Sequence, residues 1–261
     1  MAATIHYDVQ DGVARLTLDQ EAKKNALSFE MWSMLPDLVR RASANPDIRL
    51  ILVRGAGEAA FCAGADISQF GDKRTGEAAT GAYDRAVADA MAALSAAPKP
   101  TLAAIRGICF GGGLALALCC SLRIASAESR FRIPAGRLGL GYGFGNVRSL
   151  VHRLGPAATA DILFTARIFD SAEALRLDVV QRVAPADSFE DAVAALAAEI
   201  TANAPLTLAA VKQALAELER PEAQRDEAAV AAAIARCFGS ADYREGQAAF
   251  RERREPRFTG R

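Results

Sequence analysis

The chain has 261 residues, with 31 Lys and Arg against 31 Asp and Glu, so its formal net charge is zero. A balanced charge argues against a general nucleic-acid-binding protein, which needs a surplus of clustered positive charge. Hydrophobic residues make up 51% of the chain and charged residues 24%, which argues against a disordered protein and for one sizeable core.

The first half of the chain alternates between predicted strands and helices. Asp11-Gly12 lies between two segments of alternating hydrophobicity, which predicts a hairpin. Ser28 predicts a helix N-cap, because apolar residues after it recur at helical spacing. The predicted elements are strands at 5–9 and 13–18, a helix from 28, a strand at 47–54, a helix at 83–94, a strand at 101–105, a helix after the triglycine 111–113, and a strand at 122–126. Strands separated by helices predict parallel crossover units, and hence an α/β fold.

From about residue 188 the pattern changes to one helix after another. The predicted helices are 189–202, 206–218, 224–238 and 241–253. Because this region contains no predicted strand, we expect it to pack on the core or on a partner subunit. We therefore divide the chain into a core, residues 1–187, and a helical C-terminal region, residues 188–261.

Localisation and metal binding are constrained by what the sequence lacks. The N-terminal residues do not form the apolar stretch of a signal peptide, and the longest uncharged run, 107–122, is short and contains three consecutive glycines. We expect a cytoplasmic protein without a membrane-spanning helix. The five cysteines show no C-x-x-C spacing and are expected to be free thiols. His6 and His152 are far apart in sequence, so no metal site is expected.

Two glycine-containing turns are the main candidates for a functional site, since the chain has no P-loop, G-x-S-x-G or H-E-x-x-H motif. They are FCAGADI at 61–67 and GICFGGG at 107–113, each predicted to close a buried strand and open a helix. The first N–H groups of a helix are unpaired and lie at the positive end of its dipole. Two such termini brought together would offer two N–H groups to one oxygen, as in an oxyanion hole. The alternative is that the glycines only permit close packing.

Over essentially its whole length, the chain resembles the crotonase superfamily, the enoyl-CoA hydratase/isomerase family. The segments that carry the resemblance are KNAL at 24–27, FCAGADI at 61–67, RGICFGGG at 106–113, FRIP at 131–134, LGLG at 138–141 and ILFTARIFDSAEALRLDVVQRV at 162–183. The resemblance implies a spiral of β-β-α turns followed by a helical C-terminal trimerisation region. It also implies a homotrimer or hexamer that acts on an acyl-CoA thioester, with no cofactor apart from the coenzyme A of the substrate.

The same resemblance implies which residues bind the substrate. The thioester carbonyl oxygen would accept hydrogen bonds from the backbone N–H groups of Ala65 and Gly112. Coenzyme A would extend along Lys23, Ala63, Asp66 and Ile67, with Phe258 near the adenine end. By its residue type alone, Asp66 is also a good cap for a following helix.

The chain departs from the family pattern at two positions. Hydratases of this family carry one glutamate two residues after the triglycine and another just after the F-x-x-P segment, where this chain has Ala115 and Ala135. Hydration needs one carboxyl group to activate water and one to deliver a proton. The family resemblance therefore assigns the chain to enzymes named enoyl-CoA hydratases, which are lyases, but the ordinary two-glutamate mechanism is not supported.

Tyr142 is the candidate that replaces the missing acid–base pair. A phenol in a partly buried pocket donates a hydrogen bond or a proton; the alternative is a packing residue among flexible glycines. The segment is similar to that of the methylmalonyl-CoA decarboxylase branch, which carries a tyrosine here but a histidine at the position of Ala65. Three functions stay open: an enzyme that stabilises a thioester enolate, a decarboxylase of a malonyl-type CoA thioester, and a non-catalytic acyl-CoA-binding scaffold.

Overall fold

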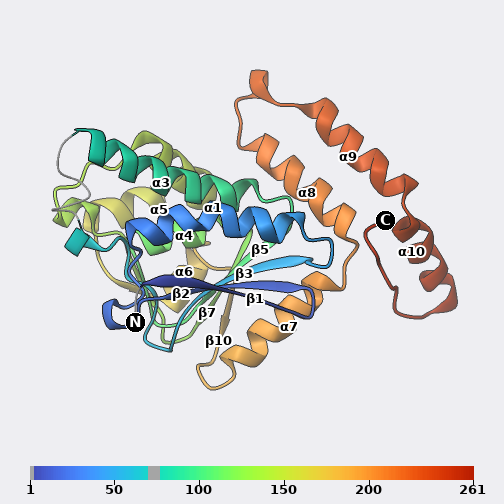
Figure 1. The fold of residues 1–261 in the computed structure, drawn as a ribbon, viewed down its shortest axis with the longest axis horizontal. Helices are drawn as coiled ribbons and strands as arrows, with labels where there is room; N and C mark the ends of the chain where they lie inside the picture. The colour runs from blue at the N-terminus through green and yellow to red at the C-terminus, as the bar shows by residue number, and fades with distance from the viewer. Residues whose placement is uncertain (1–2, 70–76) are drawn as a thin grey trace.

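The computed structural model describes residues 3–69 and 77–261, which form two sheets surrounded by helices (Figure 1). The larger sheet has six strands in the order β1-β2-β3-β5-β7-β10, and the smaller has four in the order β4-β6-β8-β9. The strands are β1 Thr4–Gln10, β2 Val13–Asp19, β3 Leu50–Gly55, β4 Ala60–Cys62, β5 Thr101–Ile105, β6 Ile108–Phe110, β7 Leu122–Ser126, β8 Arg130–Arg132, β9 Phe169–Asp170 and β10 Arg182–Ala184. The pairs β1–β2 and β8–β9 are antiparallel, and the remaining pairs between these strands are parallel.

The helices cover both faces of the larger sheet and continue beyond it. They are α1 Phe29–Ala44, α3 Glu77–Ala96, α4 Gly112–Cys119, α5 Phe144–Thr165, α6 Ser171–Arg176, α7 Phe189–Thr201, α8 Pro205–Leu218, α9 Glu227–Gly239 and α10 Ala241–Glu252. Short 3-10 helices span Glu21–Lys23, Ile67–Gln69, Ala135–Arg137 and Glu222–Gln224. The helix predicted after Ser28 is confirmed as α1, since the Ser28 hydroxyl accepts a hydrogen bond from the Met31 N–H.

A β-β-α unit recurs three times along the core. In each unit a strand of the larger sheet is followed by a strand of the smaller sheet and then by a helix: β3-β4-α3, β5-β6-α4 and β7-β8-α5. The spiral of β-β-α turns is therefore confirmed. Five strands of the larger sheet, β1, β2, β3, β5 and β7, were predicted from the sequence. The strand β10 of that sheet and all four strands of the smaller sheet were not predicted, and each of these has only two or three residues.

The alternation of side chains in β3 explains how the larger sheet is buried on both faces. Ile51 and Val53 point into the core cluster that includes α1, α3 and α4. Leu50 and Leu52 point to the opposite face, where Phe189 of α7 packs against them. A strand that is buried on both faces has a continuous run of apolar residues in the sequence. This run is why the strand could be predicted.

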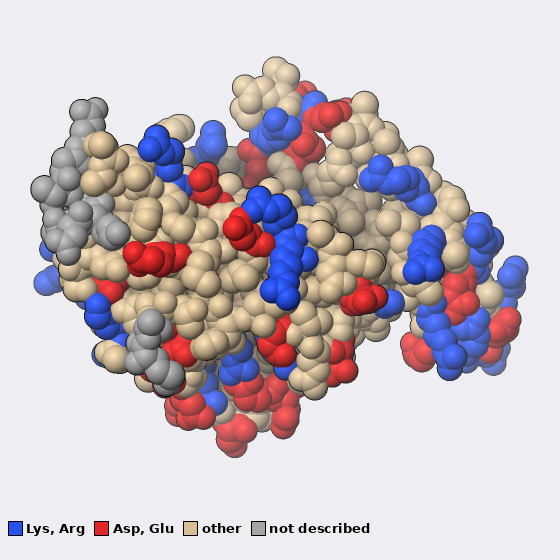
Figure 2. All heavy atoms as spheres, in the orientation of Figure 1, with Lys and Arg blue, Asp and Glu red and all other residues tan. Residues whose placement is uncertain are grey.

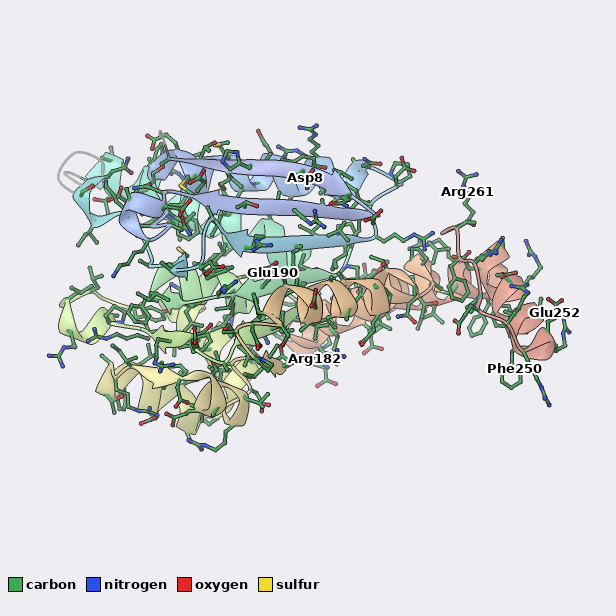
Figure 3. All side chains as sticks on the ribbon, turned by 90° about the horizontal axis from the view of Figure 1, so that it is seen from below. Asp8, Arg182, Glu190, Phe250, Glu252 and Arg261 are labelled. Atoms are coloured by element: carbon green, nitrogen blue, oxygen red, sulfur yellow. The ribbon has the colours of Figure 1, made fainter. Side chains whose placement is uncertain are left out.

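The C-terminal succession of helices is confirmed, and it leaves the core progressively. The first of them, α7, packs on the larger sheet, whereas α9 and α10 extend away from it (Figure 1; Figure 3). Phe250 of α10 is 86% exposed and Phe238 of α9 is 60% exposed. Among the described residues no single helix is long and apolar enough to cross a membrane, although α7 and α8 pass that test as a pair bent by 97°.

Candidate active site

The first glycine-containing turn is held by backbone pairing with the segment before α1. The Leu27 N–H donates to the Gly64 carbonyl at 2.7 Å, and the Asp66 N–H donates to the Leu27 carbonyl at 2.9 Å. Ala65 lies between these two bonded groups, and its own N–H takes no part in the parallel pairing. The backbone is therefore fixed on both sides of Ala65, while the Ala65 N–H is not used by these bonds.

The second glycine-containing turn joins β6 to α4. The Gly111 N–H donates to the Arg132 carbonyl at 2.8 Å, and Gly111 adopts φ 50°, a conformation that favours glycine. Gly112 is the first residue of α4, where the N–H has no carbonyl of a preceding turn to bond. The turn thus presents a fixed backbone N–H at a helix N-terminus, as the sequence predicted.

These two turns are in close contact with each other. A Cβ atom added to Gly64 would lie 3.4 Å from the Gly112 nitrogen, and one added to Gly112 would lie 3.5 Å from the Ala65 nitrogen. Gly64 also has φ +112°, which side chains of L-residues rarely adopt. The positive φ of Gly64 favours glycine, and an added Cβ there would also lie 3.3 Å from the Phe110 carbonyl oxygen. The two turns therefore pack closely at the residues that carry the two candidate N–H groups.

A cavity of about 460 Å³ lies beside the two turns. It is lined by five residues predicted to form the site, Ala63, Ala65, Ile67, Gly112 and Tyr142. It is also lined by Ala115 and Ala135, the two positions at which the chain departs from the family pattern. Its other walls come from the two turns, α1, α3, the segment directly after β8, and residues 138–146. The remaining lining residues are Trp32, Gly64, Tyr83, Asp84, Val87, Ala88, Met91, Gly111, Ile133, Pro134, Leu138, Leu140, Gly141, Gly143 and Asn146. The structure thus brings residues that are more than 100 positions apart around one cavity.

The cavity is mostly apolar, with a small number of polar side chains. Among its described lining residues Asp84 is the one with a carboxylate, and the positions of the two family glutamates carry methyl groups. Burial raises the pKa of Tyr142 to about 12, with a further contribution from Cys119. The phenol therefore stays protonated at neutral pH, and a protonated phenol has an O–H group that can donate a hydrogen bond.

Lys23 and Asp66 form a hydrogen-bonded cluster beside the first turn. The Lys23 ammonium donates to the Asp66 carboxylate at 2.7 Å and to the Ser68 hydroxyl at 2.7 Å, and the Gln20 amide donates to Asp66 at 3.0 Å. Burial alone would raise the pKa of Asp66, but the hydrogen bonds from Lys23, Ser68 and Gln20 lower it to about 2. The Ser68 N–H donates to the same carboxylate at 3.1 Å, so Asp66 also caps the 3-10 helix Ile67–Gln69, as expected.

Phe258 lies apart from this cavity. It lines a second and larger hollow of about 680 Å³ between α8, α9 and α10, which shares no lining residue with the first. The backbone carbonyl of Phe258 accepts a hydrogen bond from Arg49. Its predicted position near the adenine end of coenzyme A stays a prediction.

The cysteines beside the two turns are not reactive groups. Cys62 and Cys109 are fully buried, and burial raises the pKa of the Cys62 thiol to about 12. A thiol that stays protonated is a poor nucleophile, so these residues serve as small apolar fillers, which agrees with the prediction of free thiols. No cluster of ligands suited to a metal ion occurs within residues 3–69 and 77–261.

Four polar residues that line the cavity were not predicted from the sequence: Trp32, Tyr83, Asp84 and Asn146. One signal for the α3 wall was available, because Tyr83, Val87 and Met91 recur every four residues, as expected for one face of a helix. Nothing in the sequence indicated which face of α1 would place Trp32 against the second turn.

Comparisons with known proteins point to a single family. A sequence profile described as enoyl-CoA hydratase/isomerase matches residues 8–261. Carnitinyl-CoA dehydratase of Proteus mirabilis is 33% identical over 265 residues, with all of both chains covered. Crotonyl-CoA hydratase of Syntrophomonas wolfei is 30% identical over 250 residues, which covers 95% of each chain.

Solved structures give the same result. An enoyl-CoA hydratase/carnithine racemase from Magnetospirillum magneticum superposes with a TM-score of 0.92 at 35% identity, covering 100% of this chain and 97% of the other. A structure of a member of the enoyl-CoA hydratase/isomerase family from Hyphomonas neptunium gives a TM-score of 0.91 at 37% identity, with 98% of each chain covered. Similarity therefore extends over both the β-β-α core and the C-terminal helices.

Proposed function

The chain belongs to the enoyl-CoA hydratase/isomerase family of acyl-CoA-processing enzymes, and on that premise we propose that it acts through a thioester enolate. In this proposal the N–H groups of Ala65 and Gly112 donate to the thioester carbonyl oxygen. That oxygen carries more negative charge in the enolate than in the bound thioester, so the donors stabilise the transition state more than the ground state. Each donor of this kind lowers the barrier by roughly 3–4 kcal/mol.

The contact between the two turns is the observation that carries the proposal. Each turn is fixed by backbone hydrogen bonds that leave the relevant N–H out of the pairing, and both line one cavity. Donors fixed in advance need no reorganisation when charge develops on the oxygen, which is the condition for this type of catalysis.

Coenzyme A and the oligomer belong to the same proposal. Lys23, Ala63, Asp66 and Ile67 would contact the coenzyme, and residues 188–261 would form the assembly region of a cytoplasmic homotrimer or hexamer. Exposed apolar side chains such as Phe238 of α9 support an assembly role, since large apolar groups on a monomer surface are typical of protein interfaces. Phe250 of α10, which is labelled in Figure 3, is another. The face of the molecule in Figure 2 mixes acidic and basic groups, in keeping with a partner other than nucleic acid.

The reaction that follows the enolate depends on which groups move protons. Relatives named crotonyl-CoA hydratase and carnitinyl-CoA dehydratase add or remove water. Ala115 and Ala135 provide neither a base for water nor an acid for the substrate carbon, and such help is worth about 10²–10⁴-fold in rate. We therefore expect hydration of crotonyl-CoA to be weak or absent.

Decarboxylation of a malonyl-type CoA thioester is the second candidate, favoured by the apolar acyl side of the cavity and by Tyr142. The bond between the α carbon and the carboxylate breaks, its electron pair forms the enolate, and CO2 leaves. The enolate then takes one proton at the α carbon to give the shorter acyl-CoA. This step needs two donors for the oxygen and one proton source, but no base. Tyr142, protonated at neutral pH, supplies the proton or the hydrogen bond that directs it.

Two assays on the purified protein distinguish these reactions. The decrease of the enoyl absorbance of crotonyl-CoA measures hydration, and release of CO2 from malonyl-CoA and methylmalonyl-CoA measures decarboxylation. Rapid hydration would contradict our interpretation of Ala115 and Ala135, and absence of CO2 release from either thioester would eliminate the decarboxylase. Binding of acyl-CoA without turnover of a panel of thioesters would instead identify a non-catalytic scaffold.

A further inference from the structure

The segment after α10, residues 254–261, turns back along that helix, and we refer to it as the strap. Asp242 lies in the first turn of α10 and is 3% exposed. Its carboxylate accepts hydrogen bonds from the backbone N–H groups of Thr259 at 2.6 Å and Gly260 at 2.8 Å. Because a buried carboxylate needs donors, these two bonds attach the strap firmly to α10.

Two further contacts attach the strap along the same helix. The Glu245 carboxylate accepts a hydrogen bond from the Arg257 N–H at 2.8 Å. The ring of Phe258 lies over Gly246, since a Cβ atom added to that glycine would be 3.6 Å from Cε1 of the ring. The strap is therefore bonded to α10 over the first two turns of the helix.

Arg49 connects the strap to the core. It directly precedes β3, and its N–H donates to the Gly12 carbonyl in the turn between β1 and β2 at 2.7 Å, which fixes its backbone. Its half-buried guanidinium donates to the carbonyl of Thr201, the last residue of α7, at 3.0 Å. The same guanidinium donates to the carbonyl of Phe258 in the strap. Arg49 thus holds the strap against the core from a position 209 residues away in the sequence.

The covalent link between α9 and α10 does not by itself fix the orientation of α10. Ser240 follows α9 and is also the N-cap of α10, so one residue joins the two helices. Rotation about the two backbone dihedrals of such a joint changes the angle between them. Since α10 extends away from the larger sheet (Figure 1), the strap supplies a second attachment, which returns to the core and limits this rotation.

We propose that Arg49 is a positioning residue for the assembly surface: it fixes the strap and thereby the orientation of α10, so that self-association of the chain depends on a residue of the core. The surface that it positions carries Phe238 of α9 and Phe250 of α10. A second copy of the chain meets both side chains at once, so a changed angle between the helices reduces the complementarity of the interface. The inference rests on the proposed function, since it assumes that residues 188–261 form the assembly region.

The dissociation constant of the assembly, measured on the full-length protein by analytical ultracentrifugation, tests the inference. Arg49→Met removes the guanidinium and keeps part of the aliphatic stem. Because hydrogen bonds from charged donors are stronger than those between neutral groups, we expect the constant to rise about tenfold to a hundredfold. The control is Arg40→Met on α1, which removes an exposed arginine paired with Asp37 and should leave the constant unchanged. An unchanged constant in Arg49→Met would overturn the inference.

Hydrogen exchange shows whether the effect passes through the strap. In Arg49→Met the amides of Thr259 and Gly260 should exchange faster than in the wild type, and so should those of α10. The amides of β5, Thr101–Ile105, should keep their protection, since this strand lies inside the larger sheet. Equally faster exchange in β5 and α10 would indicate general destabilisation and contradict the inference.

A second variant releases the strap from its other side. Asp242→Asn replaces one of the two acceptor oxygens and should also weaken the assembly. The double variant with Arg49→Met should be little weaker than the stronger single variant, because both changes act through the strap. Fully additive effects would contradict the inference. If Arg49→Met does not fold, Arg49→Lys takes its place: one ammonium cannot reproduce both guanidinium bonds, so an intermediate loss is expected and no loss overturns the inference.

The wild type separates the two possible failures. A wild-type protein that stays monomeric would refute the assembly region of the proposed function, and the inference with it. A wild-type protein that assembles, together with an Arg49→Met variant that assembles equally tightly, would refute the inference alone.

Discussion

The thioester side and the acyl side of the candidate active site are built in opposite ways. The thioester side consists of backbone N–H groups in two turns that hydrogen bonds and glycines fix in place. The acyl side is formed by alanines, by Tyr142 and by the segment 138–146, in which Gly139 and Gly141 have open space around the position of a Cβ. In the proposed function, charge stabilisation is built into the backbone, whereas proton transfer depends on side chains, and Ala115 and Ala135 carry no carboxyl group.

Under the proposed function, this difference allows the family fold to be retained with a different set of proton-transfer groups. The N–H groups of Ala65 and Gly112 are set by the path of the chain, so substitution of side chains nearby leaves them intact. The two glutamates of the family pattern occupy ordinary side-chain positions, where a single substitution removes a proton-transfer group.

Gly112→Pro removes one of the two proposed donors. We expect kcat with the best thioester substrate to fall about 10²–10³-fold, because an oxyanion-hole donor contributes that much where it has been measured. Steady-state kinetics provide the measurement, and thermal unfolding checks that the variant is folded. The control is Gly81→Ala in α3, where an added Cβ meets no atom within 4 Å. Unchanged kcat in Gly112→Pro would show that this N–H has no catalytic role.

Restoring the missing carboxyl groups tests the acyl side. The double variant Ala115→Glu, Ala135→Glu should hydrate crotonyl-CoA at least about 100-fold faster than the wild type, since general acid–base catalysis contributes 10²–10⁴-fold. Two carboxyl groups in one cavity also raise the pKa of one of them, which provides the required acid beside a base. The enoyl absorbance measures the rate. Rapid hydration of crotonyl-CoA by the wild type would contradict the interpretation that hydration is weak because both carboxyl groups are missing. A folded double variant with no increase in the hydration rate would contradict it as well.

Tyr142→Phe removes the phenol hydroxyl and keeps the ring. We expect turnover of a malonyl-type thioester to fall about tenfold to a hundredfold, as for loss of a hydrogen bond to a charged group. Because burial raises the pKa of Tyr142 to about 12, the phenol keeps its proton throughout the neutral range. It loses the proton only as the pH rises through that value. The wild-type rate should therefore show no titration of Tyr142 between about pH 6 and 9. An unaltered turnover rate in Tyr142→Phe would show that Tyr142 is a packing residue without a role in the reaction.

Asp66→Asn tests how much the hydrogen-bonded carboxylate beside the first turn contributes to the free energy of unfolding. The pKa of Asp66 is lowered from 3.8 to about 2, so its ionised form stabilises the fold above the unfolded pKa, and this contribution is lost as the pH falls through about 2. We expect the variant to lose about 2 kcal/mol in the free energy of unfolding at pH 7. Urea denaturation at pH 7 and at pH 3 measures the difference, which should shrink at the lower pH. An equal loss at both values would exclude the charged network as its cause.

Much of this architecture was predictable from the sequence, and the failures have physical causes. Strands such as Thr101–Ile105 were recognised because they are buried on both faces, and the C-terminal helices because their residues favour helix. The three-residue strands β4 and β6 have no periodicity of their own, and they form because the larger sheet positions them. Polar lining residues such as Trp32 were not predicted, because the position of Trp32 depends on how α1 lies against Gly112 at the start of α4, which no local pattern encodes.

The vibrational frequency of the bound thioester carbonyl tests the central claim most directly. Butyryl-CoA labelled with ¹³C at this carbonyl gives a band that isotope-edited infrared spectroscopy separates from the protein background. Hydrogen bonds from the Ala65 and Gly112 N–H groups should lower its frequency on binding to the wild type, and Gly112→Pro should reduce that change. A carbonyl that binds with the frequency it has in an apolar solvent would contradict the account.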